Sequence, residues 1–196
     1  KFTIPEYPDY PPTYPLIVFI ATKNYFYLFA GILGGAGASI VAYHMFSHVR
    51  TRVIAFLHPW SNINDSGYQI TQSLFAIGTG GWFGLGIDQG DPTSIPYVEQ
   101  DFIFSAVAEE MGVIFGICLI LVCVSCFIVF MKIAMQLKED FYRYIAVGIS
   151  TIYIFQVFLT IGGGTRFIPL TGVTLPLVSY GGSSVLTTII MFSIIQ

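Results

Sequence analysis

The chain has 196 residues, of which 55% are hydrophobic and only 10% carry a formal charge. A soluble domain has about one charged residue in four, so this composition excludes an ordinary soluble enzyme. The net charge of −3 and the lack of a basic run exclude nucleic-acid binding, which needs a positive surface, and the apolar content excludes disorder.

The first 23 residues do not resemble the rest of the chain. Five prolines and no hydrophobic periodicity mark residues 1–15, so we expect no regular structure there. Residues 14–22 are apolar over too few positions to cross a membrane alone. The chain opens on Lys1 without a signal-peptide pattern. We interpret it as part of a larger membrane protein, with an irregular segment at 1–23 and a single membrane domain at 24–196.

Three uncharged stretches are long enough to cross a membrane: 24–49, 111–131 and 144–165. A transmembrane helix needs about 20 apolar residues. A fourth stretch, 66–87, contains six glycines and several polar residues. Its apolar side chains fall at helical spacing from 68 to 78, which predicts a short amphipathic helix at the membrane surface. A glycine-rich turn at 78–86 follows.

The last stretch, 167–196, begins with residues that no continuous helix tolerates. These are Pro169, Gly172, Pro176, Gly181 and Gly182. Irregular backbone at membrane depth occurs only where protein buries it or a water-filled cavity borders it, so we predict a re-entrant loop that lines a cavity. Residues 183–196 then predict a helix of about 21 Å, too short for a full crossing.

Basic residues indicate the orientation. Lys132, Lys138 and Arg143 lie between two predicted spans, and the positive-inside bias makes that connection cytoplasmic. The region 53–110, with most of the acidic residues, and the re-entrant loop then share the opposite face. The predicted fold is an all-α polytopic helical bundle with about four spans, and any chemistry belongs on its outer face.

Several strings on that face occur in series and carry a resemblance: His48–Val53, Pro59-Trp60, Gly67–Ser73, Gly80–Gly86, Asp101–Gly112 and Leu175–Ser184. In this order they resemble the C-terminal half of the SEDS family (FtsW, RodA, SpoVE), over residues 24 to 196. The resemblance implies the last four helices and the large outer loop of a ten-helix protein of the bacterial cytoplasmic membrane. It also implies a peptidoglycan glycosyltransferase that polymerises lipid II for cell division or cell shape, together with a class B penicillin-binding protein.

The family's general base is thought to be the aspartate at the position of Asp101. The residues themselves leave two compatible interpretations, because Asp101 ends a polar loop and precedes an apolar helix. It is either a helix N-cap or a catalytic base, and a helix N-terminus would lower its pKa. We expect that helix to run unbroken over 102–131, about 45 Å, with Glu109 and Glu110 in structural roles.

Transfer of a sugar from a lipid diphosphate needs cations for the leaving group. The candidates are Arg50, Arg52 and Arg166, since guanidinium can bind two phosphate oxygens at once. Arg50 and Arg52 could equally be anchors at the membrane interface. The polar break at Ser179, Gly181, Gly182 and Ser183 could bind an anionic headgroup at a helix start or simply allow close helix packing.

No cofactor is expected, although a divalent cation could assist the diphosphate. Cys118, Cys123 and Cys126 lie within a span and are interpreted as apolar packing, and Gly80–Gly86 lacks the preceding strand of a phosphate-binding loop. The expected partners are lipid II, the penicillin-binding protein and membrane lipid. Two alternatives stay open: a lipid II flippase or transporter, whose discontinuous helices are similar, and a non-catalytic scaffold.

Overall fold

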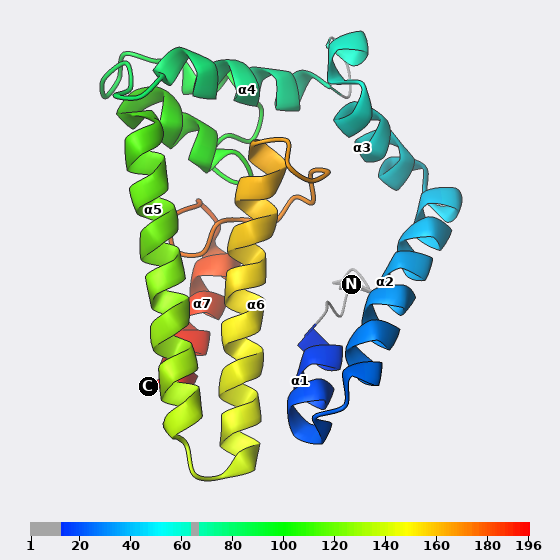
Figure 1. The fold of residues 1–196 in the computed structure, drawn as a ribbon. Coiled ribbons are helices and arrows are strands. Elements are labelled where there is room, and N and C mark those ends of the chain that lie inside the picture. Colours follow the sequence, from blue (N-terminus) through cyan, green and yellow to red (C-terminus); the bar gives the residue numbers. More distant parts are fainter. Residues whose placement is uncertain (1–12, 64–66) are drawn as a thin grey trace, which may run out of the picture.

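The computed structural model describes residues 13–63 and 67–196, and within these residues the regular structure is entirely helical (Figure 1). The long helices are α1 (Thr13–Thr22), α2 (Tyr25–Met45), α3 (Ser47–Leu57), α4 (Tyr68–Gly80), α5 (Ile103–Gln136), α6 (Asp140–Gly164) and α7 (Gly182–Ile195), with short 3₁₀ turns η1 (Pro59–Asn62) and η2 (Pro92–Ser94). The prediction of an all-α polytopic bundle is confirmed.

The N-terminal segment is more regular than the sequence predicts. Residues 13–22 form α1, so the prediction of irregular structure is wrong there, and residues 1–12 lie outside the described residues. Pro15 is compatible with this helix because it lies in the first turn, where backbone N–H groups have no helical partner. Ile20 packs against the cluster of Ala134, Ala146 and Val147, which fixes α1 beside the α5–α6 turn.

Among the described residues, three helices are long and apolar enough to cross a membrane: α2, α5 and α6. The helix predicted over 24–49 is present but shorter, since α2 ends at Met45. The Asn24 side chain accepts a hydrogen bond from Phe26 N (3.0 Å) and begins α2. Phe46 is extended (φ −111°, ψ 116°) and separates α2 from α3. Figure 1 shows both helices standing apart from α5 and α6, and no residue of α2 is buried.

The α5–α6 pair forms the centre of the bundle. Tyr153 of α6 is buried, and its ring lies 5.6 Å from that of Phe130 on α5 and 5.8 Å from that of Phe192 on α7. Cys123 belongs to the same buried cluster, as expected for small-residue packing. The predicted spans 111–131 and 144–165 are therefore confirmed as helices, although both helices are longer than predicted.

The prediction of one unbroken helix over 102–131 is wrong. Gly112 has φ 86° and ψ 165° inside α5, a conformation almost confined to glycine. The first part of α5 runs beneath α4 before the long part turns away (Figure 1). Four backbone hydrogen bonds join the break to the loop after α4: Leu85 N to Glu109 O (2.9 Å), Gly86 N to Glu110 O (3.0 Å), Val113 N to Gly81 O (3.0 Å) and Ile114 N to Trp82 O (3.3 Å).

We call these four bonds the splice, because the loop replaces the helical hydrogen bonds that Gly112 interrupts. In a regular helix, Val113 N and Ile114 N would donate to the carbonyls four residues earlier. Here the loop supplies both the missing acceptors and the missing donors. The glycine-rich turn predicted from the sequence thus exists, and it is built into the wall of the bundle.

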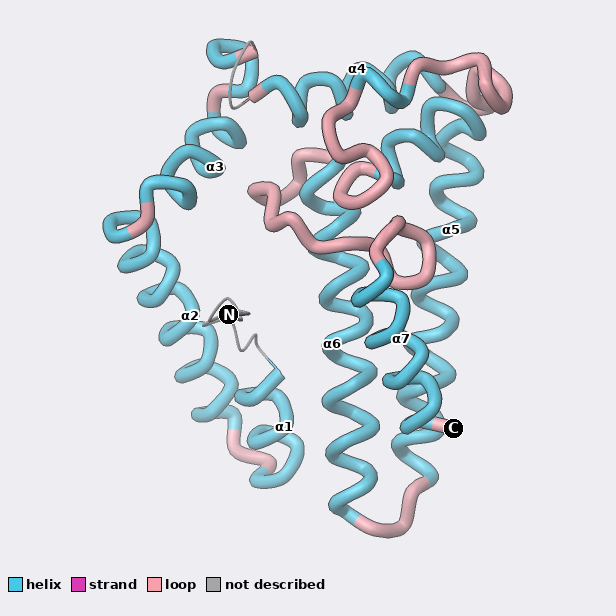
Figure 2. Tube along the Cα trace, turned by 180° about the vertical axis from the view of Figure 1, so that it is seen from behind, coloured by secondary structure: helices cyan, strands magenta, loops and turns pink. Residues whose placement is uncertain are grey.

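The predicted re-entrant loop is also present. Residues 165–181 contain no regular helix, and Figure 2, which views the molecule from behind, shows them crossing in front of α6 to the start of α7 part-way down the bundle. Two side chains of α6 hold this loop: Gln156 Nε2 donates to Thr174 O (3.0 Å), and Thr160 Oγ1 donates to Val173 O (2.8 Å). The α7 helix has 14 residues, as short as predicted.

Candidate active site

Asp101 lies on the connection between η2 and α5, and its carboxylate is half-buried. The N-cap interpretation is wrong, because Phe102 occupies the N-cap position and no side chain caps the helix. Phe102 is fully buried against Ala76 and Ile95, and this packing fixes the backbone position of the neighbouring Asp101. The Asp101 carboxylate makes no hydrogen bond or ion pair with any described residue.

The guanidinium of Arg52 lies close to this carboxylate. Arg52 Nη1 donates to Leu170 O (3.3 Å) and Thr171 O (2.9 Å) in the re-entrant loop. A β-carbon on Gly172 would lie 3.5 Å from Arg52 Nη2 and 3.7 Å from Asp101 Oδ2. Both charged groups therefore border the space that Gly172, at φ +77° and without a side chain, leaves open.

Arg52 and Asp101 do not form a direct ion pair. Across residues 13–63 and 67–196 the one ion pair within 4 Å joins Arg143 to Asp140, in the first turn of α6. A carboxylate that is near a cation but not bound to it remains able to accept a proton. Its neighbouring guanidinium keeps donors that loop carbonyls do not occupy.

Burial raises the pKa of the Asp101 carboxyl above its ordinary value of 3.8, and the charge of Arg52 opposes that rise only in part. The expectation of a pKa lowered by a helix N-terminus is therefore wrong in direction, because the carboxylate does not cap the helix. A carboxylate with a raised pKa is a stronger base at neutral pH than an exposed one.

Hydrogen bonds tie the re-entrant loop to the residues just before Asp101. Ser179 Oγ donates to Gln100 O (2.5 Å) and accepts from Leu175 N (2.8 Å), while Tyr180 N donates to Glu99 O (2.7 Å). Ser179 is buried. The structure gives this predicted binding residue a positioning role, since its hydroxyl is engaged on both sides.

Arg166 contacts α3 rather than Asp101. Its Nε donates to Phe56 O (3.1 Å) and its Nη2 to Leu57 O (3.4 Å), the last carbonyls of α3. Arg52 of α3 therefore binds carbonyls of the re-entrant loop, and Arg166 of that loop binds carbonyls of α3. We call this reciprocal arrangement the arginine clasp. Arg50 is exposed and makes no side-chain hydrogen bond with the described residues. Of the three predicted arginines, only Arg52 acts on the pKa of Asp101.

The other predicted binding residues lie at the start of α7. Gly181 is the N-cap residue and is extended (φ 179°), and no side chain caps this helix. Gly182 and Ser183 are exposed. Their proposed contact with an anionic headgroup stays a prediction.

Glu109 and Glu110 bind the loop between α4 and α5 rather than a neighbouring helix. Glu109 Oε1 accepts from Asp91 N (3.4 Å), and Glu110 Oε1 accepts from Asp88 N (3.3 Å). Glu109 is only 7% exposed and its Oε2 has no partner. Sequence reasoning missed these loop contacts and also missed Gly172 as a neighbour of the charged pair. The position of Gly172 within the proline- and glycine-rich loop was the sequence feature that could have indicated this contact.

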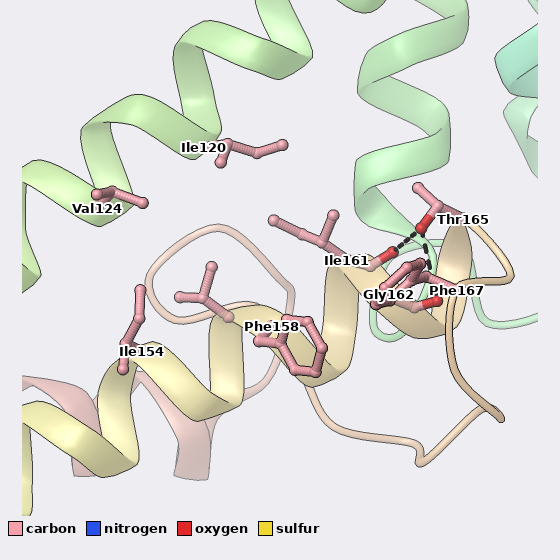
Figure 3. A pocket seen from close by; sticks show the side chains of 9 residues that line it. Ile120, Val124, Ile154, Phe158, Ile161, Gly162, Thr165 and Phe167 are labelled. Atoms are coloured by element: carbon pink, nitrogen blue, oxygen red, sulfur yellow. Dashed lines mark hydrogen bonds between the residues drawn. The ribbon is translucent and has the colours of Figure 1, made fainter.

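An apolar pocket of about 270 Å³ lies between α5 and α6 (Figure 3). Its lining is Ile120, Val124, Ile154, Val157, Phe158, Ile161, Gly162, Thr165 and Phe167. Thr165 Oγ1 donates to Ile161 O (2.7 Å). This pocket suits hydrocarbon and contains no titratable side chain. Within the described part of the chain, no three His, Cys, Asp or Glu side chains gather as a metal site would require.

The family model of the FtsW, RodA and SpoVE cell cycle proteins matches residues 13–196. The chain belongs to this family. It is 39% identical over 181 residues to the peptidoglycan glycosyltransferase RodA of Mycobacterium tuberculosis, covering 92% of this chain and 38% of that protein. It is 48% identical over 142 residues to a probable peptidoglycan glycosyltransferase FtsW of Francisella salina, covering 69% and 35%.

The fold of this family member also matches a solved structure. A chain of a peptidoglycan synthase complex, described as coordinating polymerization and crosslinking, superposes with a TM-score of 0.71 at 24% identity. The match covers 91% of this chain and 50% of that one. The chain therefore spans half or less of the length of these relatives. The residues that the family model matches include Asp101, Arg52 and the re-entrant loop.

Proposed function

We propose that the protein to which this chain belongs is a peptidoglycan glycosyltransferase that polymerises lipid II, with Asp101 as the general base. The observation that carries this proposal is a half-buried carboxylate with a raised pKa and no bonding partner, next to the Arg52 guanidinium. The names of the RodA and FtsW relatives support the same reaction class.

In the proposed reaction, Asp101 accepts the proton of an acceptor sugar hydroxyl while that oxygen attacks the anomeric carbon of the donor. The new bond forms between this oxygen and the anomeric carbon, and the bond from that carbon to the diphosphate oxygen breaks. The electron pair leaves with the lipid diphosphate, whose negative charge Arg52 stabilises. Attack opposite the leaving group inverts the anomeric carbon.

The active face, in this proposal, is the outer face of the bacterial cytoplasmic membrane. Lys132 lies in α5 and Lys138 beyond its end, at the opposite end of the bundle from Asp101, and basic residues favour the cytoplasmic side. A class B penicillin-binding protein is the proposed partner, a choice that the fold match to a chain of a synthase complex supports. A divalent cation bound to the diphosphate is compatible with this chemistry.

The test is polymerisation of purified lipid II by the full-length protein with its partner. Asp101→Asn should lower the rate by about 10²–10⁴-fold, the usual contribution of a general base. Asp88→Asn is the matched control. Asp88 is an exposed aspartate of the same outer loop at φ +62°, which asparagine also tolerates.

Three outcomes would reject the proposal. Full activity of Asp101→Asn would exclude the residue as the base. If the wild-type complex moved lipid II between vesicle leaflets and formed no polymer, the flippase alternative would replace the glycosyltransferase. If it did neither and only recruited the partner, the scaffold alternative would stand.

A further inference from the structure

The loop that forms the splice presents large apolar side chains to its surroundings. Trp82 is 69% exposed and Phe83 is 84% exposed, and Leu85 and Ile87 are exposed as well. The proposed reaction uses none of them. Large exposed apolar side chains grouped on one short loop indicate a contact with a partner or a membrane.

The splice fixes the depth of this patch along the membrane span. Trp82 O accepts the hydrogen bond of Ile114 N, so the loop backbone lies level with Ile114 of α5. From Ile114 to Lys132 the helix rises about 27 Å, close to the roughly 30 Å of hydrocarbon in a bilayer. If Lys132 marks one edge of the hydrocarbon, Trp82 lies at the other edge.

The patch continues the exposed apolar surface of α5. Ile114 is exposed at the splice, and Phe115 and Ile117 are exposed just beyond it on the same helix. Residues 66–87 carry no charged side chain, and the first one after them is Asp88. The sequence thus changes from apolar to charged residues along this loop, as expected where a chain leaves the lipid for water.

The loop is also held rigidly in this place. Besides the splice, the Glu110 and Glu109 carboxylates accept the backbone N–H groups of Asp88 and Asp91. In Figure 1 the loop forms the corner where α4 meets α5, on the side of the bundle away from α2 and α3. Little ordering is needed before the side chains enter a lipid surface.

We propose that Trp82, Phe83, Leu85 and Ile87 form a lipid-anchoring surface that inserts into the boundary between headgroups and acyl chains. Aromatic side chains prefer this boundary, since their rings are apolar and the indole N–H can bond to headgroups. The occupant is membrane lipid. The surface holds the outer loop, and with it the stretch leading to Asp101, at a fixed height above the bilayer.

Depth-dependent fluorescence quenching tests this surface without relying on enzyme activity. The full-length protein is reconstituted into phosphatidylethanolamine–phosphatidylglycerol vesicles that contain a nitroxide lipid, labelled either near the acyl carbonyl or near the acyl terminus. The difference in emission between wild type and Trp82→Phe isolates Trp82 from every other tryptophan. Phe83→Trp in the Trp82→Phe background provides a second probe on the same loop.

We expect the shallow nitroxide to remove most of the Trp82 signal, the deep nitroxide to remove less, and aqueous iodide to have little effect. The Phe83→Trp probe should give the same order. Strong quenching by iodide without quenching by lipid would place the loop in water and overturn the proposal. Protection from all three quenchers would show that protein covers the patch, which also overturns it.

Discussion

Gly112 is the residue on which the splice depends, and its replacement by alanine is a stringent test of that structure. At φ 86° and ψ 165°, an L side chain is strained whatever space surrounds it. A β-carbon there would also lie 2.4 Å from Trp82 O and 2.5 Å from Gly84 N. Both contacts are with backbone atoms, so the loop must move away.

The expected cost follows from these two effects. The backbone conformation alone costs about 1–3 kcal/mol. Each hydrogen bond of the splice contributes about 0.5–1.5 kcal/mol, and a displaced loop loses at least two of the four. We therefore expect Gly112→Ala to destabilise the protein by about 2–6 kcal/mol, a large fraction of the usual 5–15 kcal/mol for a folded domain.

Unfolding in detergent, followed by temperature or by denaturant, measures this difference. Gly78→Ala is the matched control, because Gly78 is helical in α4 and has nothing within 4 Å of an added β-carbon. That substitution should be neutral or stabilise by about 0.5–1 kcal/mol. If the two variants unfolded alike, α5 would not be broken at Gly112 and the splice would be wrong.

Three further predictions concern the charged residues. Polymerisation should need the ionised form of Asp101, so activity should be lost as pH falls through a pKa above the ordinary 3.8. Arg52→Gln should move the acidic limb of the pH–rate profile to higher pH, because the charge of Arg52 lowers the pKa of Asp101. Arg50→Gln is the control and should leave the limb in place. An unshifted limb in Arg52→Gln would contradict the placement of Arg52 beside Asp101. Glu109→Ala should destabilise by about 1–3 kcal/mol, because the half-buried hydrogen bond from Asp91 N loses its acceptor. Glu110→Ala should cost less, because Glu110 and its bond from Asp88 N are more exposed. Equal thermal unfolding of the two variants would contradict this assignment.

Hydropathy predicted the elements whose length the bilayer determines. The spans that became α2, α5 and α6 were visible as uncharged runs of about 20 residues. The re-entrant loop was visible because Pro169 and Gly172 cannot continue a helix. These features depend on local composition, which a single sequence contains in full.

Features that depend on distant partners were not visible. Nothing in the run around Gly112 distinguishes a glycine that packs against a helix from one that breaks it, because the loop that replaces the lost hydrogen bonds lies about 30 residues earlier. Asp101 has the sequence pattern of an N-cap, yet the burial of Phe102 moves the helix start by one residue. Arg50 and Arg52 point in different directions on one helix, and the side that faces Asp101 depends on how α3 is oriented.

The arginine clasp has a thermodynamic consequence for α3. This helix buries only Ala55, and its ties to the re-entrant loop are guanidinium–carbonyl hydrogen bonds. Its release exposes little apolar surface, so the heat capacity of that opening is small and its free energy varies little with temperature. The cation beside Asp101 is therefore carried on a unit that can detach while the α5–α6 core stays folded, so we expect denaturation to separate Arg52 from Asp101 before the helices of that core are lost.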